Sequence, residues 1–252
     1  IQRAVLNYDP SFCDMYEDAH ARQAAEEYLE PIRRHLRERF NGQQLAILDA
    51  GCQAGRLLIP LAQDGHRLIG IDTSGFALRR ARQHARERRL AVQLHTGNIA
   101  SLRRWIAPAS LDAALCIEVL YLCQDYRQLL ELLADSVKPG GLLCVSHRPV
   151  QFYVASALRP GQPELATSVS RRIEGPSPDG DYHNWQTPEQ LQELYASLSL
   201  RILGQHPVDH TECRIDANLL VDEEVRRLLE PARQTDSTFH IPSYILAVTQ
   251  KS

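Results

Sequence analysis

One stretch decides how this chain folds: Ile47-Leu48-Asp49-Ala50-Gly51-Cys52-Gln53-Ala54-Gly55. Its apolar start predicts a buried strand that ends at an acidic residue. Gly51 and Gly55 then predict a turn where the backbone can come close to a ligand. The following residues, 56–62, have the composition of a helix. A strand, a glycine turn and a helix in this order are typical of nucleotide-binding sites.

The spacing of this stretch narrows the class of nucleotide. A dinucleotide fingerprint needs a glycine where Gln53 stands, and a P-loop needs a lysine that is absent nearby. The next predicted strand ends at Asp72, where an acid can accept hydrogen bonds from ribose hydroxyls. Asp49 and Asp72 together disfavour a diphosphate. They favour a nucleoside that carries a positive charge.

The regions around this stretch predict an α/β fold. After a helical segment near 16–40, interrupted by Pro31, strands near 45–50, 67–72, 91–96, 111–118 and 142–147 alternate with helices. Apolar strands with helices between them predict a parallel sheet covered on both faces. Residues 149–182 show no clear period and predict an irregular lid or binding loop. A helix capped by Thr187 and strands near 201–205 and 244–249 complete the pattern.

Composition excludes several function classes. The 252 residues carry a net charge of −3, which argues against a nucleic-acid backbone as partner. No apolar run reaches the roughly 20 residues that span a bilayer, so we expect no membrane partner. Six cysteines without a C-x-x-C pair favour the reducing cytoplasm. Because the first residue is Ile1, we expect a trimmed chain or a part of a longer one.

At this point the chain resembles the class I S-adenosylmethionine-dependent methyltransferases. Beyond the opening stretch, the pieces that carry the resemblance stand in the family's order: Gly70-Ile71-Asp72-Thr73-Ser74, Gly97-Asn98-Ile99, Leu111–Leu120 and Leu132–Gly141. The resemblance implies a Rossmann-like seven-stranded, mostly parallel sheet with helices on both faces and an antiparallel last strand. An irregular cap insert would follow the fifth strand. The cofactor would be S-adenosylmethionine and its product S-adenosylhomocysteine.

The resemblance also implies a cofactor site. The turn would lie against the methionine part of the cofactor, Asp72 would hold the ribose, Asn98 would border the adenine, and Glu118 would lie near the methyl group. The full set of expected cofactor contacts is Asp49, Gly51, Cys52, Gln53, Gly55, Asp72, Thr73, Asn98, Ile99, Ile117 and Glu118. Two of these depart from the family pattern. Gln53 replaces a common glycine, so its turn must be reshaped if it needs a positive φ, and Asn98 replaces a common aspartate.

Candidates for catalysis and acceptor binding are less specific. His147 and Glu118 end predicted strands near the expected cleft, so either is a candidate catalytic residue, although a hydrogen-bonded rim residue is the simpler interpretation. The candidate substrate-binding residues are Tyr16, Tyr121, His147, Tyr182, His183 and Trp185, and Tyr8 and Phe12 could join the same lid. We expect no metal site. The sequence neighbours His206, Asp209, His210 and Cys213 follow a strand pattern with Pro207, which argues against a helical ligand pair.

These observations predict a single domain, 1–252, with four parts. They are an N-terminal helical cap (1–44), a cofactor-binding core (45–148), a cap insert for the substrate (149–186) and the C-terminal part of the core (187–252). We expect methyl transfer to a small-molecule acceptor. Three alternatives remain open: a cofactor-binding domain without methyl transfer, a nucleic-acid or protein methyltransferase, and another reaction on the same fold. Within the second, the amino-methylating nucleic-acid enzymes carry an Asn/Asp-Pro-Pro-Tyr element where this chain has Glu118-Val119-Leu120-Tyr121.

Overall fold

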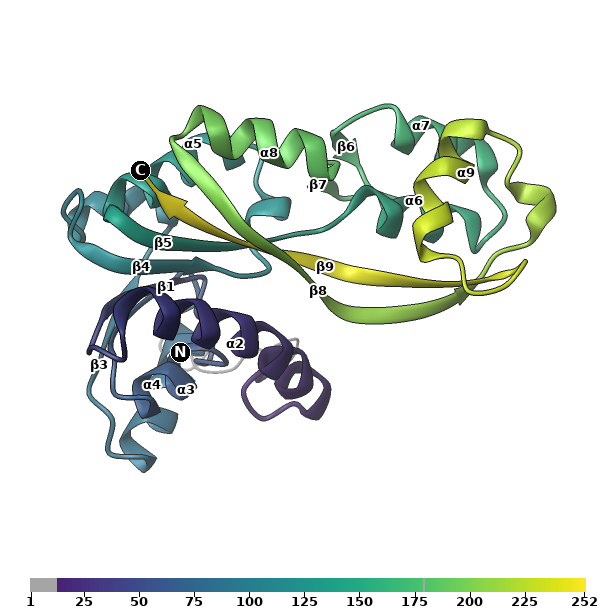
Figure 1. Ribbon diagram of the computed structural model, residues 1–252. Coiled ribbons are helices and arrows are strands. Elements are labelled where there is room, and N and C mark those ends of the chain that lie inside the picture. The colour runs from purple at the N-terminus through teal and green to yellow at the C-terminus, as the bar shows by residue number, and fades with distance from the viewer. Residues whose placement is uncertain (1–12, 179) are drawn as a thin grey trace.

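A mixed sheet of seven strands forms the centre of the molecule in this computed structural model, which describes residues 13–178 and 180–252. Its order is β3-β2-β1-β4-β5-β9-β8 (Figure 1). The strands are β1 Ala46–Ala50, β2 Arg67–Asp72, β3 Val92–Thr96, β4 Leu111–Cys116, β5 Val137–His147, β8 Leu200–Arg214 and β9 Thr238–Lys251. The first five pair in parallel, and β9 is antiparallel to both of its neighbours. The predicted fold class is confirmed.

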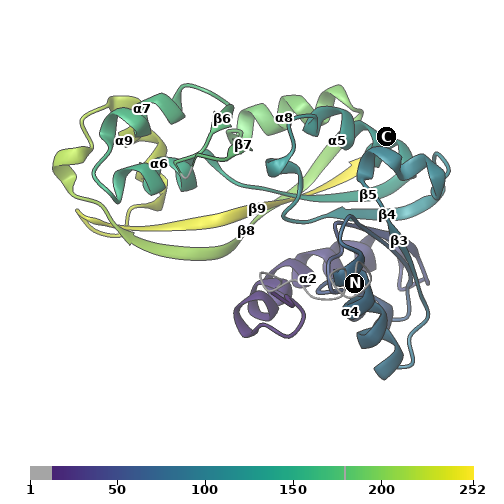
Figure 2. The same cartoon turned by 180° about the vertical axis from the view of Figure 1, so that it is seen from behind.

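Helices cover both faces of this sheet (Figures 1 and 2). One face carries α2 Ala19–Phe40, α3 Leu58–Gln63 and α4 Gly75–Glu87, and the other carries the short 3-10 helix η1 Ile99–Arg104, α5 Tyr126–Ser136 and α8 Pro188–Ser197. Within β1, Ile47 packs into the first core and Leu48 into the second, as expected for a strand covered on both sides. The predicted interruption at Pro31 is wrong, because α2 continues through this buried proline.

The insert after β5 is more regular than the sequence predicts. It contains α6 Val150–Leu158, α7 Pro163–Ser170 and a two-stranded hairpin of β6 Glu174–Pro176 and β7 Tyr182–Asn184. Each helix spans only 8 or 9 residues, too few for a clear helical period. Their apolar side chains form a third core with α9 Glu223–Leu229, Trp185 and the distal parts of β8 and β9. We use the name cap for the part of the molecule built around this third core.

The strands β8 and β9 are about three times and twice as long as the sequence predicts, at 15 and 14 residues. They pair from Leu200↔Lys251 to Arg214↔Thr238, and the hairpin twists away from the sheet to reach the cap (Figure 1). The distal half alternates exposed residues with side chains such as Cys213 and Phe239, which the cap buries. Among the described residues, no helix has the length and apolar character of a membrane-spanning segment.

Candidate functional site

A cavity of about 480 Å³ opens at the carboxyl ends of β1, β2 and β4. This volume lies in the range of small-molecule sites, and strand ends are where open α/β sheets bind ligands. The lining residues are Met15, Asp49, Gly51, Cys52, Gln53, Arg56, Leu57, Ile71, Asp72, Thr73, Gly97, Asn98, Ile99, Ile117, Glu118, Val119, Tyr121, Leu122, Cys123 and Leu129. The structure thus brings together every expected cofactor residue except Gly55.

The glycine turn after β1 has a steric reason. Gly51 has a φ of +84°, and a Cβ atom at this position would lie 2.3 Å from the side chain of Val119. Gly55, with a φ of +96°, would place a Cβ atom 2.8 Å from Ile59. Gly51 therefore allows the turn to approach the end of β4, whereas Gly55 serves the packing of α3 behind the cavity wall.

Asp72 fixes the shape of this turn as well as the end of β2. Its Oδ2 atom accepts a hydrogen bond from the backbone N–H of Gln53 (2.9 Å), and its Oδ1 atom accepts one from Ser74 (2.8 Å). Each carboxylate oxygen has a second lone pair, so Asp72 can also accept hydrogen bonds from a diol. The Asn98 side-chain oxygen caps η1 by accepting from Ala100 (2.9 Å) and likewise keeps one lone pair.

Asp49 is buried at the floor of the cavity. Burial raises the pKa of its carboxyl to about 7, with nearby Arg56 acting to lower it and Asp72 acting to raise it further. A carboxyl in this condition is stabilised in its charged form by a cation bound close to it. The floor of the cavity therefore favours a positively charged ligand.

The structure shows how the turn accommodates Gln53 at the position where the family commonly has a glycine. It has a φ of +44°, so the turn adopts the left-handed conformation without the common glycine. Its side chain binds the N-terminal segment: Oε1 accepts from the backbone N–H of Met15 (3.2 Å), and Nε2 donates to the carbonyl of Cys13 (3.1 Å). Met15 lines the cavity. Gln53 thus holds residues 13–15 against the cofactor turn.

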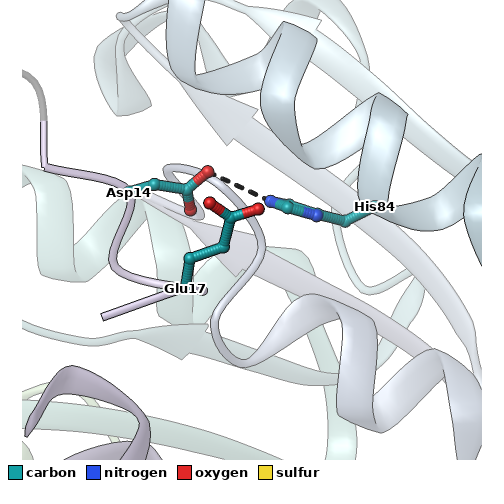
Figure 3. Close-up of side chains that lie close together, drawn as sticks. All are labelled: Asp14, Glu17 and His84. Atoms are coloured by element: carbon teal, nitrogen blue, oxygen red, sulfur yellow. Dashed lines mark hydrogen bonds and ion pairs between the residues drawn. The ribbon is translucent and has the colours of Figure 1, made fainter. Parts of the chain in front are cut away.

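A second set of contacts holds the same segment from α4 (Figure 3). Asp14 lies 3.1 Å from Nε2 of His84, and Arg80 donates to both Asp14 and Glu17 at 2.8 Å. Burial raises the pKa of the Asp14 carboxyl, but the bonds from Arg80 and His84 outweigh this and lower it. Two carboxylates and a histidine could hold a metal ion. Because Arg80 already donates a hydrogen bond to each acid, we assign this cluster to anchoring the segment.

Arg56 and Glu118 form an ion pair in the cavity wall that the sequence did not predict. Their side chains lie 2.9 Å apart and are both largely buried. Glu118 has a φ of +59°, and its backbone N–H donates to the hydroxyl of Ser146 (2.6 Å), which fixes the end of β4. Arg56 also lies over the ring of Tyr28, 5.8 Å from its centroid. The sequence feature that could have indicated Arg56 as a site residue is its position directly after Gly55 of the turn.

Of the candidate substrate residues, Tyr121 lines the cavity. His183 lies edge-on to Tyr121, with ring centroids 5.4 Å apart. The neighbouring Asn184 donates to the carbonyls of Leu120 (2.8 Å) and Cys123 (3.2 Å), so β7 docks on the short helix η2 Leu120–Leu122 in the cavity wall. The insert therefore supports this wall from behind.

The remaining aromatic candidates lie elsewhere. Trp185 is 1% exposed and donates its indole N–H to carbonyls of the cap, so it anchors the cap. Tyr182 donates to Glu174 within the β6–β7 hairpin. Tyr16 packs against His84 with the two rings tilted by 31° and their centroids 4.4 Å apart, and the guanidinium of Arg88 lies over the Tyr16 ring. Tyr8 and Phe12 lie outside the described residues.

The structure places His147 away from the main cavity. Its Nε2 atom lies 2.6 Å from the hydroxyl of Tyr195 in α8, and it lines a separate cavity of about 280 Å³. Burial lowers the pKa of the His147 imidazole to about 4. Successive side chains along a strand point to opposite faces of the sheet, and the His147 side chain points to the face covered by α8. The geometry favours a structural role for His147 over that of a base.

The histidines of β8 also separate. His206 lies 3.3 Å from His35 of α2, and His210 stacks on His240 of β9, with ring centroids 4.8 Å apart. They therefore face different partners instead of sharing one ligand.

Comparisons with known proteins agree with this geometry. Residues 47–141 match a family model described as a methyltransferase domain. A ubiquinone biosynthesis O-methyltransferase of Methylocella silvestris is 37% identical over 161 residues, which are 62% of this chain and 58% of that protein. A ubiquinone biosynthesis O-methyltransferase of Rickettsia felis is 25% identical over 213 residues, which are 82% of this chain and 82% of that protein. The chain thus spans less than two thirds of the first of these relatives.

Solved structures share the fold at low identity. Magnesium protoporphyrin IX methyltransferase from Synechocystis PCC 6803, solved with bound S-adenosylhomocysteine, has a TM-score of 0.60 and 15% identity and covers 100% of this chain and 93% of its own. An S-adenosylmethionine-dependent methyltransferase from Mesorhizobium loti has a TM-score of 0.60 and 17% identity and covers 89% of this chain and 98% of its own.

Proposed function

We propose that this chain, a class I S-adenosylmethionine-dependent methyltransferase by its fold and by its family match over residues 47–141, transfers a methyl group to a small organic acceptor. The observation that carries the proposal is the cavity at the strand ends. There the glycine turn, the buried Asp49 and the hydrogen-bonding Asp72 lie together. The cavity lining holds three acids, Asp49, Asp72 and Glu118, against one arginine that is already paired with Glu118, which suits a cationic nucleoside better than a phosphate.

Each part of the cavity has a task toward this cofactor. When bound, S-adenosylmethionine supplies a methyl group already activated by a positively charged sulfur. Asp72 would accept hydrogen bonds from the ribose hydroxyls, and Asn98 and Ile99 would border the adenine. Gly51 allows the turn to lie against the methionine part. Asp49 and Cys52 complete that end of the site.

The rest of the cavity would position the acceptor and exclude water, which is most of what this reaction requires of the protein. Tyr121 forms the wall beside Glu118, and Met15 closes the side held by Gln53. Glu118, held by Arg56, is the group placed to bind the proton of an acceptor hydroxyl. The names of the relatives support an oxygen acceptor.

Two further observations support the finer parts of this proposal. The cavity lining contains Asp49, Asp72 and Glu118 against Arg56, a balance that does not attract a nucleic-acid backbone. All six cysteines are free thiols, which suits a reducing compartment such as the cytoplasm.

A turnover experiment tests the proposal. The purified chain is incubated with methyl-labelled S-adenosylmethionine and a panel of catechols, phenols and amines, and labelled product is separated and counted. We expect transfer to at least one hydroxyl compound and formation of S-adenosylhomocysteine in equal amount. Cofactor binding without transfer across the panel would instead favour a binding domain.

A further inference from the structure

Arg148 follows β5 directly, lies over the ring of Tyr121, which lines the main cavity, and has no acidic partner among the described residues. In the part of the chain that the structure describes, no ion pair includes it. Its side chain is half-buried. A guanidinium stays charged under all ordinary conditions, and a charge removed from water without a partner is unfavourable. The contacts around Arg148 must therefore offset the cost of removing its charge from water.

Aromatic rings form those surroundings. The guanidinium carbon lies 4.3 Å from the ring centroid of Phe152, 4.7 Å from that of Tyr244 and 4.8 Å from that of Tyr121. Nη2 donates to the hydroxyl of Tyr244. These contacts offset part of the desolvation and orient the guanidinium. They leave its positive charge unneutralised.

The remaining donors show where a ligand can bind. Within the described chain, Nε and Nη1 of Arg148 have no acceptor, and Nε is fully buried. Nη1 is therefore the donor that an added molecule can reach. Tyr121 connects this point with the main cavity, because it both lines the cavity and contacts Arg148.

We propose that Arg148, with Tyr121, Phe152 and Tyr244, forms a subsite for the carboxylate of an aromatic acceptor. The inference rests on the proposed methyl transfer and names the chemical class of its acceptor. The rings favour a planar molecule, and the single cation favours a monoanion. Glu118 lines the same cavity as Tyr121, and its negative charge repels a dianion such as a phosphate more strongly than a monoanion.

Benzoate and benzamide test this subsite because they share one shape and differ in charge. Both are titrated by NMR into the protein saturated with S-adenosylhomocysteine. We expect benzoate to bind at least tenfold tighter than benzamide, since hydrogen bonds to a charged group carry this much discrimination. Equal affinity for the two, or no binding of benzoate, overturns the inference. Failure of S-adenosylhomocysteine to bind in the first step would instead count against the proposed function.

Variants assign the effect to Arg148. Arg148→Gln is expected to remove the preference for benzoate, and Arg148→Lys to keep part of it, because lysine retains the charge and loses the planar fork. Arg159→Gln, an exposed position at the end of α6, is the matched control and should keep the full preference. A benzoate preference that persists in Arg148→Gln overturns the assignment. If that variant does not fold, the lysine variant and the wild-type ligand pair decide the question.

Discussion

Gln53 offers the sharpest test of how the cavity is closed. Its side chain makes two hydrogen bonds to residues 13–15, at 3.1 and 3.2 Å, and its backbone has a φ of +44°. Each bond contributes about 0.5–1.5 kcal/mol, so removing both weakens the hold on the segment by ~1–3 kcal/mol. The left-handed conformation itself costs a non-glycine residue ~1–2 kcal/mol. Two substitutions separate these contributions.

Gln53→Ala loses both bonds and keeps the strained conformation, so we expect it to lower the free energy of unfolding by ~1–3 kcal/mol. Gln53→Gly loses the same bonds but relieves the strain, so we expect its free energy of unfolding to be ~1–2 kcal/mol higher than that of Gln53→Ala. Both variants should speed hydrogen exchange at the Met15 amide, which donates to Gln53, by roughly 5- to 150-fold.

The assay combines urea denaturation with hydrogen exchange followed by NMR. Gln44→Ala is the control, because it removes a comparable side-chain bond to the carbonyl of Gly65 away from the segment. It should leave exchange at Met15 unchanged. Wild-type exchange rates at Met15 in both Gln53 variants would refute the reasoning, as would equal destabilisation by the alanine and glycine variants.

Two further variants test the floor and the turn of the cavity. The pKa of Asp49 is raised to about 7 from its ordinary 3.8, so its contribution to stability is present at low pH and is lost as pH rises from about 4 through 7, by on the order of 4 kcal/mol. Asp49→Asn should remove this loss, so its urea midpoint should fall less between pH 5 and pH 8 than that of the wild type. An equal fall in both proteins would contradict the raised pKa of Asp49. Gly51→Ala adds a Cβ atom 2.3 Å from Val119 to an unfavourable φ and should destabilise by ~2–4 kcal/mol. Gly42→Ala, also at positive φ but with open space around it, should cost only about 1 kcal/mol; equal urea midpoints for the two variants would show that the contact with Val119 does not matter.

The sequence predicted the parts of the site that follow from strand ends. Asp49 and Asp72 lie at the carboxyl ends of adjacent parallel strands, so their meeting at one edge follows from the alternation of strands and helices. Met15 and Arg148 could not be found this way. Met15 reaches the cavity through tertiary contacts of Gln53, and Arg148 is surrounded by rings from three separate segments.

The errors also have physical causes. The side to which His147 points depends on the register of β5, which a short apolar run does not fix. The sequence of residues 149–182 shows no helical period because the helices there are short and complete their core only with Trp185 and the distal parts of β8 and β9. The sequence marks where the extra segment lies but not what it packs against.

The most direct test of the central claim is a calorimetric titration with S-adenosylhomocysteine. We predict binding at one site per chain, weakened at least tenfold by Asp72→Asn, which removes the charged acceptor for the ribose hydroxyls. Asp64→Asn, which breaks a surface pair with Arg33, should bind like wild type. Absence of binding to the folded wild-type chain, or equal affinities for wild type and Asp72→Asn, would contradict the claim that this cavity holds the cofactor through Asp72.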